Sequence, residues 1–438
     1  MRSIREIITP GIRAGKRQKA LTHRNNNATI LQVSAQHKPE LDGIRGMAII
    51  GVLLTHSWPY IKTTAATGKL VYLLVAAMTF GQWGVDLFFV LSGFLITGIL
   101  IDTKHATNYL RSFYARRALR ILPIYYGVVV MLFLLSLVVP WLAENLPLRR
   151  EWAPYFVYLQ NVPLFWTIGH REVTLVGHFW SLAVEEQFYL IWPFVVFFLP
   201  KRTILWICAV GCVLALPLRV YLQHHIFGMS WTAMIITTAR MDGLFVGAAC
   251  AILVRRFSLF PVGIAAAFTG IGVSILGWIA VFHRQGEFFG AGPYMRTFGV
   301  TAVALLSGAL LGFSQRRSLL LDRFLTFSGL RFFGRYAYGL YVFHIPVYLL
   351  AGGLIAPKVG LHLPLPLKPA ILFILVINAF SIALAVVSFE FFETRILRQK
   401  SRFKAKFPGV ERPAGLVDET DSTSGARERP AAWRASGI

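Results

Sequence analysis

The chain has 438 residues, of which 56% are hydrophobic and only 15% are charged. Soluble domains carry about 25% charged residues, so this composition excludes an ordinary soluble protein and indicates a polytopic membrane protein. In a soluble protein the net charge of +24 would suggest a nucleic-acid partner. Here the basic residues gather in the two ends and in alternate loops, and no nucleic-acid partner is expected.

Residues 1–40 are polar and basic and lack the apolar stretch of a secretory signal peptide. A mitochondrial transit peptide would have a similar composition, but we expect a basic, flexible cytosolic tail. The transmembrane domain is expected at residues 41–397. Residues 398–438 are again basic and polar, which predicts a disordered cytosolic tail.

Apolar runs between the tails predict an all-α bundle of about ten transmembrane helices. The expected spans are residues 46–60, 84–101, 121–140, 179–200, 203–221, 231–254, 261–282, 294–313, 336–355 and 368–390. The apolar run 70–80 is too short to span, and we interpret it as an interfacial or re-entrant segment. The aromatic stretch 152–168 is interpreted in the same way.

The basic residues also predict the orientation of the bundle. With the N-terminus inside, most of the 44 Lys and Arg residues fall in the tails and in the loops on the inner side. Cytoplasmic loops carry such an excess, so both termini are expected to lie inside. The sequence carries no signal for an oligomeric state.

The first span, LDGIRGMAIIGVLLTHSWPY, carries two ionisable residues, Arg45 and His56. Eleven residues of helix make about three turns and rise about 16 Å, so both side chains share one face. Arg45 would lie at the membrane boundary and His56 near the middle of the bilayer. Because an ionisable group at that depth is costly, it indicates a functional site.

Two further segments on the inner half contain candidate binding residues. In RSFYARRALRILP, Arg116 and Arg120 are four residues apart and share a face, with Arg117 beside them. This cluster could contact lipid phosphates, or it could bind the phosphates of a cytosolic donor. In FFVLSGFLITGIL, Ser92 and Gly93 allow either a close helix approach or backbone contact with a ligand. A nucleophilic role for Ser92 is disfavoured because no histidine motif adjoins it.

Later spans add ionisable residues at a similar expected depth. Glu185 and Glu186 lie in the fourth span, and Glu185 is the better candidate to orient His56. Arg240 and Asp242 lie in the sixth span, two residues apart, so each would need a partner on another helix. They could fix helix packing or line a polar cavity, as could His344, which precedes Pro346.

The chain contains three cysteines, Cys208, Cys212 and Cys250, all within apolar runs. Cys208 and Cys212 can share a helix face, but they have no histidine or carboxylate neighbours in the sequence. We therefore interpret all three as small core residues, and no metal site is expected.

Taken together, these segments resemble the acyltransferase 3 family of integral membrane acyltransferases. The matching segments, in family order, are LDGIRGMAIIGVLLTH, FFVLSGFLI, FYARRALRILPIYY, HFWSLAVEEQFYLIWP, ARMDGLFVGA and YGLYVFHIPV. The resemblance implies an inner-membrane enzyme that moves an acyl group, commonly acetyl, from cytosolic acyl-CoA to a hydroxyl of a glycan or glycolipid. No bound cofactor is implied, since acyl-CoA is the donor substrate.

The resemblance also implies residue roles. It makes His56 the essential histidine and Glu185 the acidic residue of the W-S-L segment. Arg45, the Arg116–Arg117–Arg120 cluster, Ser92 and Gly93 would contact the donor.

Two features depart from the family pattern. Members often end the last span with Glu-Arg-Pro, whereas this chain reads FFETRILR and keeps only Glu393. Some relatives carry a hydrolase-like domain after the membrane body. Here a short polar tail follows, so the chain is expected to act alone or with a separate partner.

His56 could deprotonate the acceptor hydroxyl or form a transient acyl-histidine. A rival hypothesis is a glycan or lipid transporter or flippase, in which the same polar residues line a substrate path. A membrane scaffold would explain the hydrophobicity but not the buried carboxylates.

Overall fold

The computed structural model describes residues 38–63, 68–145, 152–162, 175–226, 234–257, 260–282, 294–316 and 318–408. Within these ranges the regular structure is helical, apart from one isolated bridge between Ile61 and Leu365. Residues Pro39–Lys406 form one compact unit. The all-α prediction is therefore confirmed for the described residues. Of the expected tails, 1–40 and 398–438, residues 1–37 and 409–438 lie outside the described residues.

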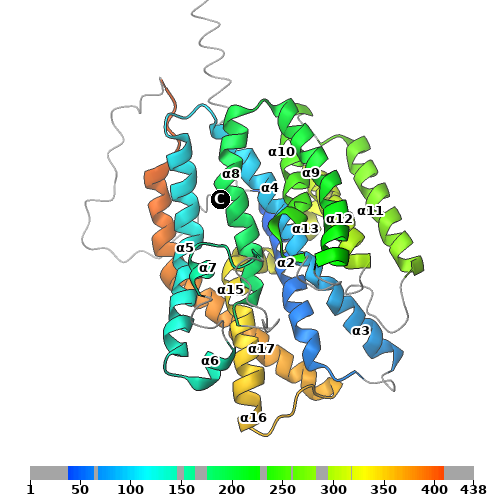
Figure 1. The fold of residues 1–438 in the computed structure, drawn as a ribbon, viewed down its shortest axis with the longest axis vertical. Helices are drawn as coiled ribbons and strands as arrows, with labels where there is room; N and C mark the ends of the chain where they lie inside the picture. Colours follow the sequence, from blue (N-terminus) through cyan, green and yellow to red (C-terminus); the bar gives the residue numbers. More distant parts are fainter. Residues whose placement is uncertain are drawn as a thin grey trace, which may run out of the picture. The chain divides into compact units, whose positions relative to one another are not determined.

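The first half of the chain supplies the helices that carry most of the candidate site (Figure 1). These are α2 (Pro39–Ser57), η2 (Trp58–Tyr60), α3 (Lys69–Phe80), η3 (Gly81–Trp83), α4 (Gly84–Thr103), α5 (Tyr109–Ser136), α6 (Pro140–Asn145), α7 (Ala153–Phe156), η6 (Gly177–Phe179), α8 (Trp180–Phe198), α9 (Lys201–Tyr221) and η7 (Leu222–Ile226).

The second half continues with helices that complete the bundle. These are η9 (Thr237–Ala239), α10 (Met241–Phe257), α11 (Val262–Phe282), η11 (Met295–Gly299), α12 (Val300–Ser314), α13 (Leu319–Leu325), α14 (Ser328–Arg335), α15 (Ala337–Leu349), η12 (Leu350–Ile355), α16 (Ala356–Lys358), α17 (Leu367–Val387), η13 (Ser388–Glu393), α18 (Thr394–Leu397) and η14 (Arg398–Phe403).

Eight helical stretches are long and apolar enough to cross a membrane, so the protein is a multi-pass membrane protein. They are Lys69–Thr103, Tyr109–Ser136, Gly177–Phe198, Lys201–His225, Val262–Val281, Met295–Ser314, Ala337–Lys358 and Leu367–Phe403. Each matches one of the ten expected spans. The other two expected spans are α2, which carries three charged residues near its start, and α10, which has only 17 residues.

The segment 70–80 differs from expectation. It forms α3, which continues through η3 into α4 as one helical stretch of 35 residues. The intervening glycines do not end the helix. Instead, a Cβ atom on Gly81 would lie 2.2 Å from the carbonyl oxygen of Gly51, so this glycine lets α2 approach closely. Of the segment 152–168, residues 152–162 are described and contain the single turn α7.

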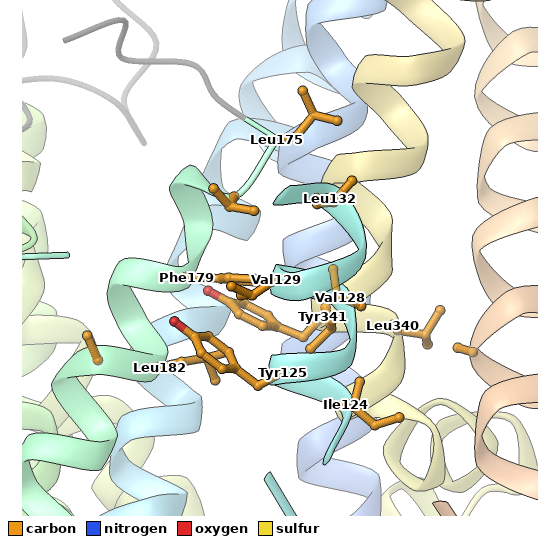
Figure 2. Close-up of a cluster of buried hydrophobic side chains, with 14 of the residues drawn as sticks. Ile124, Tyr125, Val128, Val129, Leu132, Leu175, Phe179, Leu182, Leu340 and Tyr341 are labelled. Carbon is orange, nitrogen blue, oxygen red and sulfur yellow. The ribbon is translucent and has the colours of Figure 1, made fainter. Parts of the chain in front are cut away.

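A buried apolar cluster holds α5 against the start of α8 and against α15 (Figure 2). Tyr125, Val128, Val129 and Leu132 of α5 follow the i, i+3, i+4, i+7 spacing of one helix face. They pack with residues such as Phe179 of η6 and with Leu182 and Leu340. This packing fixes α5, which carries the arginine cluster, beside α15, which carries His344.

The ordered body extends beyond the boundary expected after residue 397. Residues 394–403 contain no proline, and the helical run that begins with α17 continues through η13 and α18 to Phe403 in η14. Residues 404–408 then follow as extended chain and turn.

Candidate active site

His56 lies in the last turn of α2 and contacts a second histidine. Its Nδ1 atom is 2.8 Å from the carbonyl oxygen of Val52 and 3.3 Å from Nε2 of His344. The two rings are 5.0 Å apart between centroids. His344 is fully buried, at 0% exposure, whereas His56 is only partly buried. His344 is therefore the direct side-chain partner of His56.

Backbone carbonyls determine how the two rings share protons. Nδ1 of His344 lies 3.0 Å from the carbonyl oxygen of Leu340 and 2.8 Å from that of Tyr341. A carbonyl oxygen only accepts, so this Nδ1 carries a proton and Nε2 of neutral His344 is an acceptor. Nδ1–H of His56 then donates to Val52 and to His344. This assignment leaves the lone pair of His56 on Nε2.

A third histidine, His178 of η6, adjoins this pair and was not among the predicted site residues. Its ring centroid is 5.1 Å from that of His344 and 5.3 Å from that of Tyr341. Both ring nitrogens of His178 are buried, and the ring lies beside the backbone of Tyr341 and Val342. The sequence feature that could have identified His178 is its position two residues before the W-S-L segment.

Glu185 does not contact His56 among the described residues. Its Oε1 accepts a hydrogen bond of 2.6 Å from the hydroxyl of Ser92, which in turn accepts one of 3.0 Å from Tyr189. Glu185 also interacts electrostatically with Arg117 and Arg120. The carboxylate expected to orient the histidine therefore lies beside the predicted donor residues.

The predicted donor-binding arginines form one cationic cluster. Arg45 of α2 pairs with Asp42 at 2.7 Å and interacts electrostatically with Arg117. Arg120 interacts with both of these arginines, and Arg117 also lies 5.3 Å from the centre of the Tyr189 ring. Arg116 adjoins Arg117 in the same way. Helices α2 and α5 thus present four half-buried guanidinium groups together.

Gly93 has a packing role. A Cβ atom at this position would lie 2.0 Å from the carbonyl oxygen of Leu244, so α4 and α10 approach closely here. Of the two roles expected for Gly93, a close approach of helices or backbone contact with a ligand, this contact supports the first. Ser92, the preceding residue, faces Glu185.

Glu186 interacts electrostatically with Glu185 and with Arg117 of the cationic cluster. It lies among tyrosines and interacts electrostatically with Tyr125, Tyr126 and Tyr158. Its Oε1 is buried and has no hydrogen-bond partner among the described residues.

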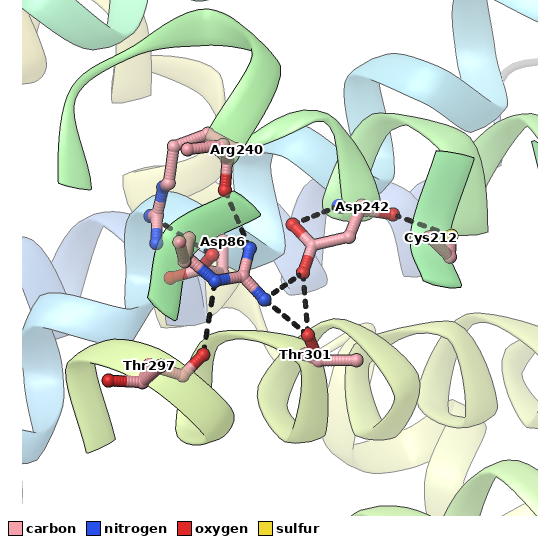
Figure 3. A network of polar contacts seen from close by, with 9 residues as sticks. Asp86, Cys212, Arg240, Asp242, Thr297 and Thr301 are labelled. Carbon is pink, nitrogen blue, oxygen red and sulfur yellow. Dashed lines mark hydrogen bonds and ion pairs between the residues drawn. The ribbon is translucent and has the colours of Figure 1, made fainter. Parts of the chain in front are cut away.

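Arg240 and Asp242 each have a partner on another helix, as their spacing predicted (Figure 3). Arg240 pairs with Asp86 of α4 at 3.0 Å, and Asp242 pairs with Arg219 of α9 at 2.9 Å. All four side chains are almost completely buried. Asp86 and Arg219 were not predicted as site residues, although each is an isolated charge in an apolar run, which is a recognised signal.

Tyr341 of α15 connects the histidines with the donor residues. Its hydroxyl donates to the carbonyl oxygen of His178 at 2.8 Å and also bonds to Ser181. The ring lies 5.8 Å from that of His344, and the side chain interacts electrostatically with Glu185. Glu185 and Tyr341 therefore lie between the cationic cluster and the histidines beside His56.

Within the described ranges, no group of three or more His, Cys, Asp or Glu residues is arranged to hold a metal ion. Cys208, Cys212 and Cys250 are free thiols, and the first and third are buried.

Comparisons with known proteins identify the family of the chain. The sequence model of the acyltransferase 3 family, described as an acyltransferase domain, matches residues 38–390. One similar protein is the peptidoglycan O-acetyltransferase OatA of Listeria monocytogenes, 29% identical over 413 residues that cover 86% of this chain and 58% of the relative.

Two further relatives have similar names. The O-acetyltransferase OatA of Staphylococcus aureus is 26% identical over 85% of this chain and 59% of its own length. The putative peptidoglycan O-acetyltransferase YrhL of Bacillus subtilis is 27% identical over 72% of this chain and 49% of its own. The chain therefore spans only about half to three fifths of these relatives. No solved structure matches it.

Proposed function

The chain belongs to the acyltransferase 3 family, and on that basis we propose that it is a membrane O-acyltransferase. It moves an acyl group, with acetyl the expected one, from cytosolic acyl-CoA to a hydroxyl of a glycan. The names of its relatives make peptidoglycan the first acceptor to test. The expected location is a bacterial inner membrane.

One observation supports this proposal most directly: Glu185 and Tyr341 lie between the cationic cluster and the histidines beside His56. Arg117 and Arg120 interact with Glu185, Glu185 with Tyr341, and Tyr341 adjoins His178 and His344. Arginine forks match phosphate groups, so the cationic cluster suits the nucleotide part of acyl-CoA. His56 supplies an imidazole with a free lone pair.

The distance between Arg45 and His56 along α2 suits a donor molecule that contacts both residues. Arg45 and His56 are separated by eleven residues, or about 16 Å of helix. This is comparable with the length of the extended phosphopantetheine arm that joins the phosphates of coenzyme A to its thioester. A donor held by Arg45 and the α5 arginines would present its thioester near His56.

In the proposed reaction, Nε2 of His56 accepts the proton of the acceptor hydroxyl while the oxygen attacks the thioester carbon. The carbon–sulfur bond breaks, and the coenzyme A thiolate leaves and takes up the proton. The imidazolium that forms keeps its Nδ1–H on Val52 and on the lone pair of His344. In the alternative form, Nε2 itself attacks and carries the acyl group to the acceptor. Both forms require an unblocked Nε2.

Removal of the imidazole tests the reaction. In His56→Ala we expect acyl transfer to fall by at least about 100-fold, because a positioned general base contributes 10²–10⁴-fold. The measurement is transfer of acetyl from labelled acetyl-CoA to peptidoglycan fragments. His362→Ala, which removes an exposed histidine, is the matched control and should keep full activity. An active His56→Ala enzyme would refute this mechanism.

Donor binding separates an acyltransferase from a transporter. The double change Arg116→Glu, Arg120→Glu should weaken coenzyme A binding by at least about tenfold, whereas Arg111→Glu on the exposed side of α5 should not. A wild-type protein indifferent to coenzyme A would favour the transporter.

A further inference from the structure

The segment after the last membrane helix docks on the start of α5. The amide of Thr107 and the side-chain amide of Asn108 donate to the carbonyl oxygens of Lys406 and Lys404, at 2.8 and 2.9 Å. Asn108 also accepts from the amide of Lys406 at 2.8 Å, and the hydroxyl of Ser112 donates to Phe403 at 2.8 Å. One backbone hydrogen bond and three bonds between side chains and the backbone therefore fix residues 403–406 beside α5.

Docking places one lysine of this segment in the cationic cluster. The ammonium group of Lys400 interacts electrostatically with Arg45, Arg116, Arg117 and Arg120. The other basic side chains of this segment are exposed to water. Arg398, Arg402, Lys404 and Lys406 are all exposed, and Lys400 alone among these five is half-buried.

The cluster carries more positive than negative charge. Four carboxylates interact with its five cations: Asp42 with Arg45, Glu393 with Arg120, Glu185 with Arg117 and Arg120, and Glu186 with Arg117. No hydrogen bond or ion pair is recorded from the Lys400 ammonium to a carboxylate among the described residues. Like charges gathered out of bulk water repel one another unless an anion joins them. The arrangement is thus suited to a ligand with several negative charges.

We propose that residues 398–406 form one wall of the donor site and that Lys400 binds a phosphate group of acyl-CoA. This inference rests on the proposed acyltransferase function. A lysine supplies a compact charge with three donors, which complements the planar forks of the α5 arginines. Phosphate is also present in lipid headgroups, so the test must separate the two sources.

The first arm measures coenzyme A binding to the full chain in nanodiscs of a neutral lipid. In Lys400→Gln the dissociation constant should rise about tenfold, since hydrogen bonds to charged groups contribute about that much. Arg402→Gln removes the same charge from an exposed position of the same segment and should change binding less than twofold. Lys400→Arg should bind nearly as well as wild type. Unchanged melting temperatures would show that all variants are folded.

The second arm replaces a third of the neutral lipid with phosphatidylglycerol. If a lipid headgroup occupies the position, Lys400→Gln will lose bound phosphatidylglycerol and keep wild-type affinity for coenzyme A, which overturns the inference. Equal coenzyme A affinity in Lys400→Gln and wild type overturns it as well, while the proposed function stands. A wild-type protein that binds no coenzyme A would overturn both.

Discussion

At the scale of single residues, the partner of His56 is a second histidine rather than a carboxylate. His344 offers its Nε2 lone pair to Nδ1–H of His56 because its own Nδ1–H is bound to two backbone carbonyls. As a neutral acceptor, His344 fixes the orientation and the tautomer of the His56 ring. Unlike a carboxylate, it carries no negative charge. His344 is therefore a positioning residue in the proposed reaction.

The role of His344 can be separated from simple packing. We expect His344→Phe to lower kcat at least about tenfold with little change in the KM for acetyl-CoA, because the donor site is untouched. His344→Gln, whose amide oxygen can accept the same hydrogen bond, should recover part of the loss. A merely structural histidine would give equal defects in both variants, in step with their melting temperatures.

The buried ion pair of Arg240 and Asp86 also acts at this scale. The guanidinium group lies 5.6 Å from the Phe89 ring and 5.5 Å from that of Trp180, and its Nε and Nη1 atoms have no hydrogen-bond partner among the described residues. The carboxylate of Asp86 thus balances the charge of Arg240. Loss of either partner would leave an uncompensated buried charge.

A double-mutant cycle measures this dependence. Asp86→Leu alone should destabilise the protein by about 3–5 kcal/mol, and the combined Asp86→Leu, Arg240→Met change should be markedly milder. The measurement is thermal unfolding of detergent-purified protein. Additive losses from the two single changes would show that the pair is not coupled.

At the scale of elements, the site depends on how closely α4 packs against α10. Gly93 and Gly247 allow this approach, since a Cβ on Gly247 would lie 2.0 Å from the carbonyl oxygen of Val90. In a membrane, helices associate mainly through such tight van der Waals contact between small residues. The approach also sets the position of Ser92 opposite Glu185.

Gly93→Ala tests this packing role. We expect a loss of stability of about 1–3 kcal/mol or more, because the added methyl overlaps the backbone of α10. Gly127→Ala on α5 is the matched control, since a Cβ there meets nothing within 4 Å. If Gly93→Ala keeps its melting temperature but loses donor affinity, contact with the donor would be the better interpretation.

At the scale of the whole molecule, the hydrogen bonds between Thr107 and Lys406 place the start of α5 and the C-terminal segment on one side of the membrane. Basic loops predict that this side is cytosolic. In a chain whose native cysteines are changed to alanine, His105→Cys and Lys406→Cys should react with an impermeant maleimide only in inverted vesicles. His362→Cys, before α17, should react in intact spheroplasts. The reverse pattern would refute the inside location of the termini.

The sequence predicted the helical class, all eight stretches that can span and the separate partners of Arg240 and Asp242. Helix periodicity places Arg116 and Arg120 on one face, whereas the expectation that Arg45 joins them at a donor site came from the family resemblance. The pairing of Glu185 failed for a geometric reason. The sequence gives the depth of a residue in the membrane only to within several ångströms. A hydrogen bond requires a donor–acceptor distance of about 3 Å and helices rotated so that the two side chains face each other. Residues 398–408 were expected to be disordered, since their composition does not reveal hydrogen bonding with α5.

The contact between Thr107 and Lys406 joins positions that are 299 residues apart. Translation must therefore deliver nearly every membrane helix to the bilayer before the backbone partners of Asn108 and Ser112 leave the ribosome. A nascent chain halted before residue 403 would contain His56 but would lack the C-terminal part of the proposed donor site. The proposed donor site would in this way be completed only at the end of synthesis.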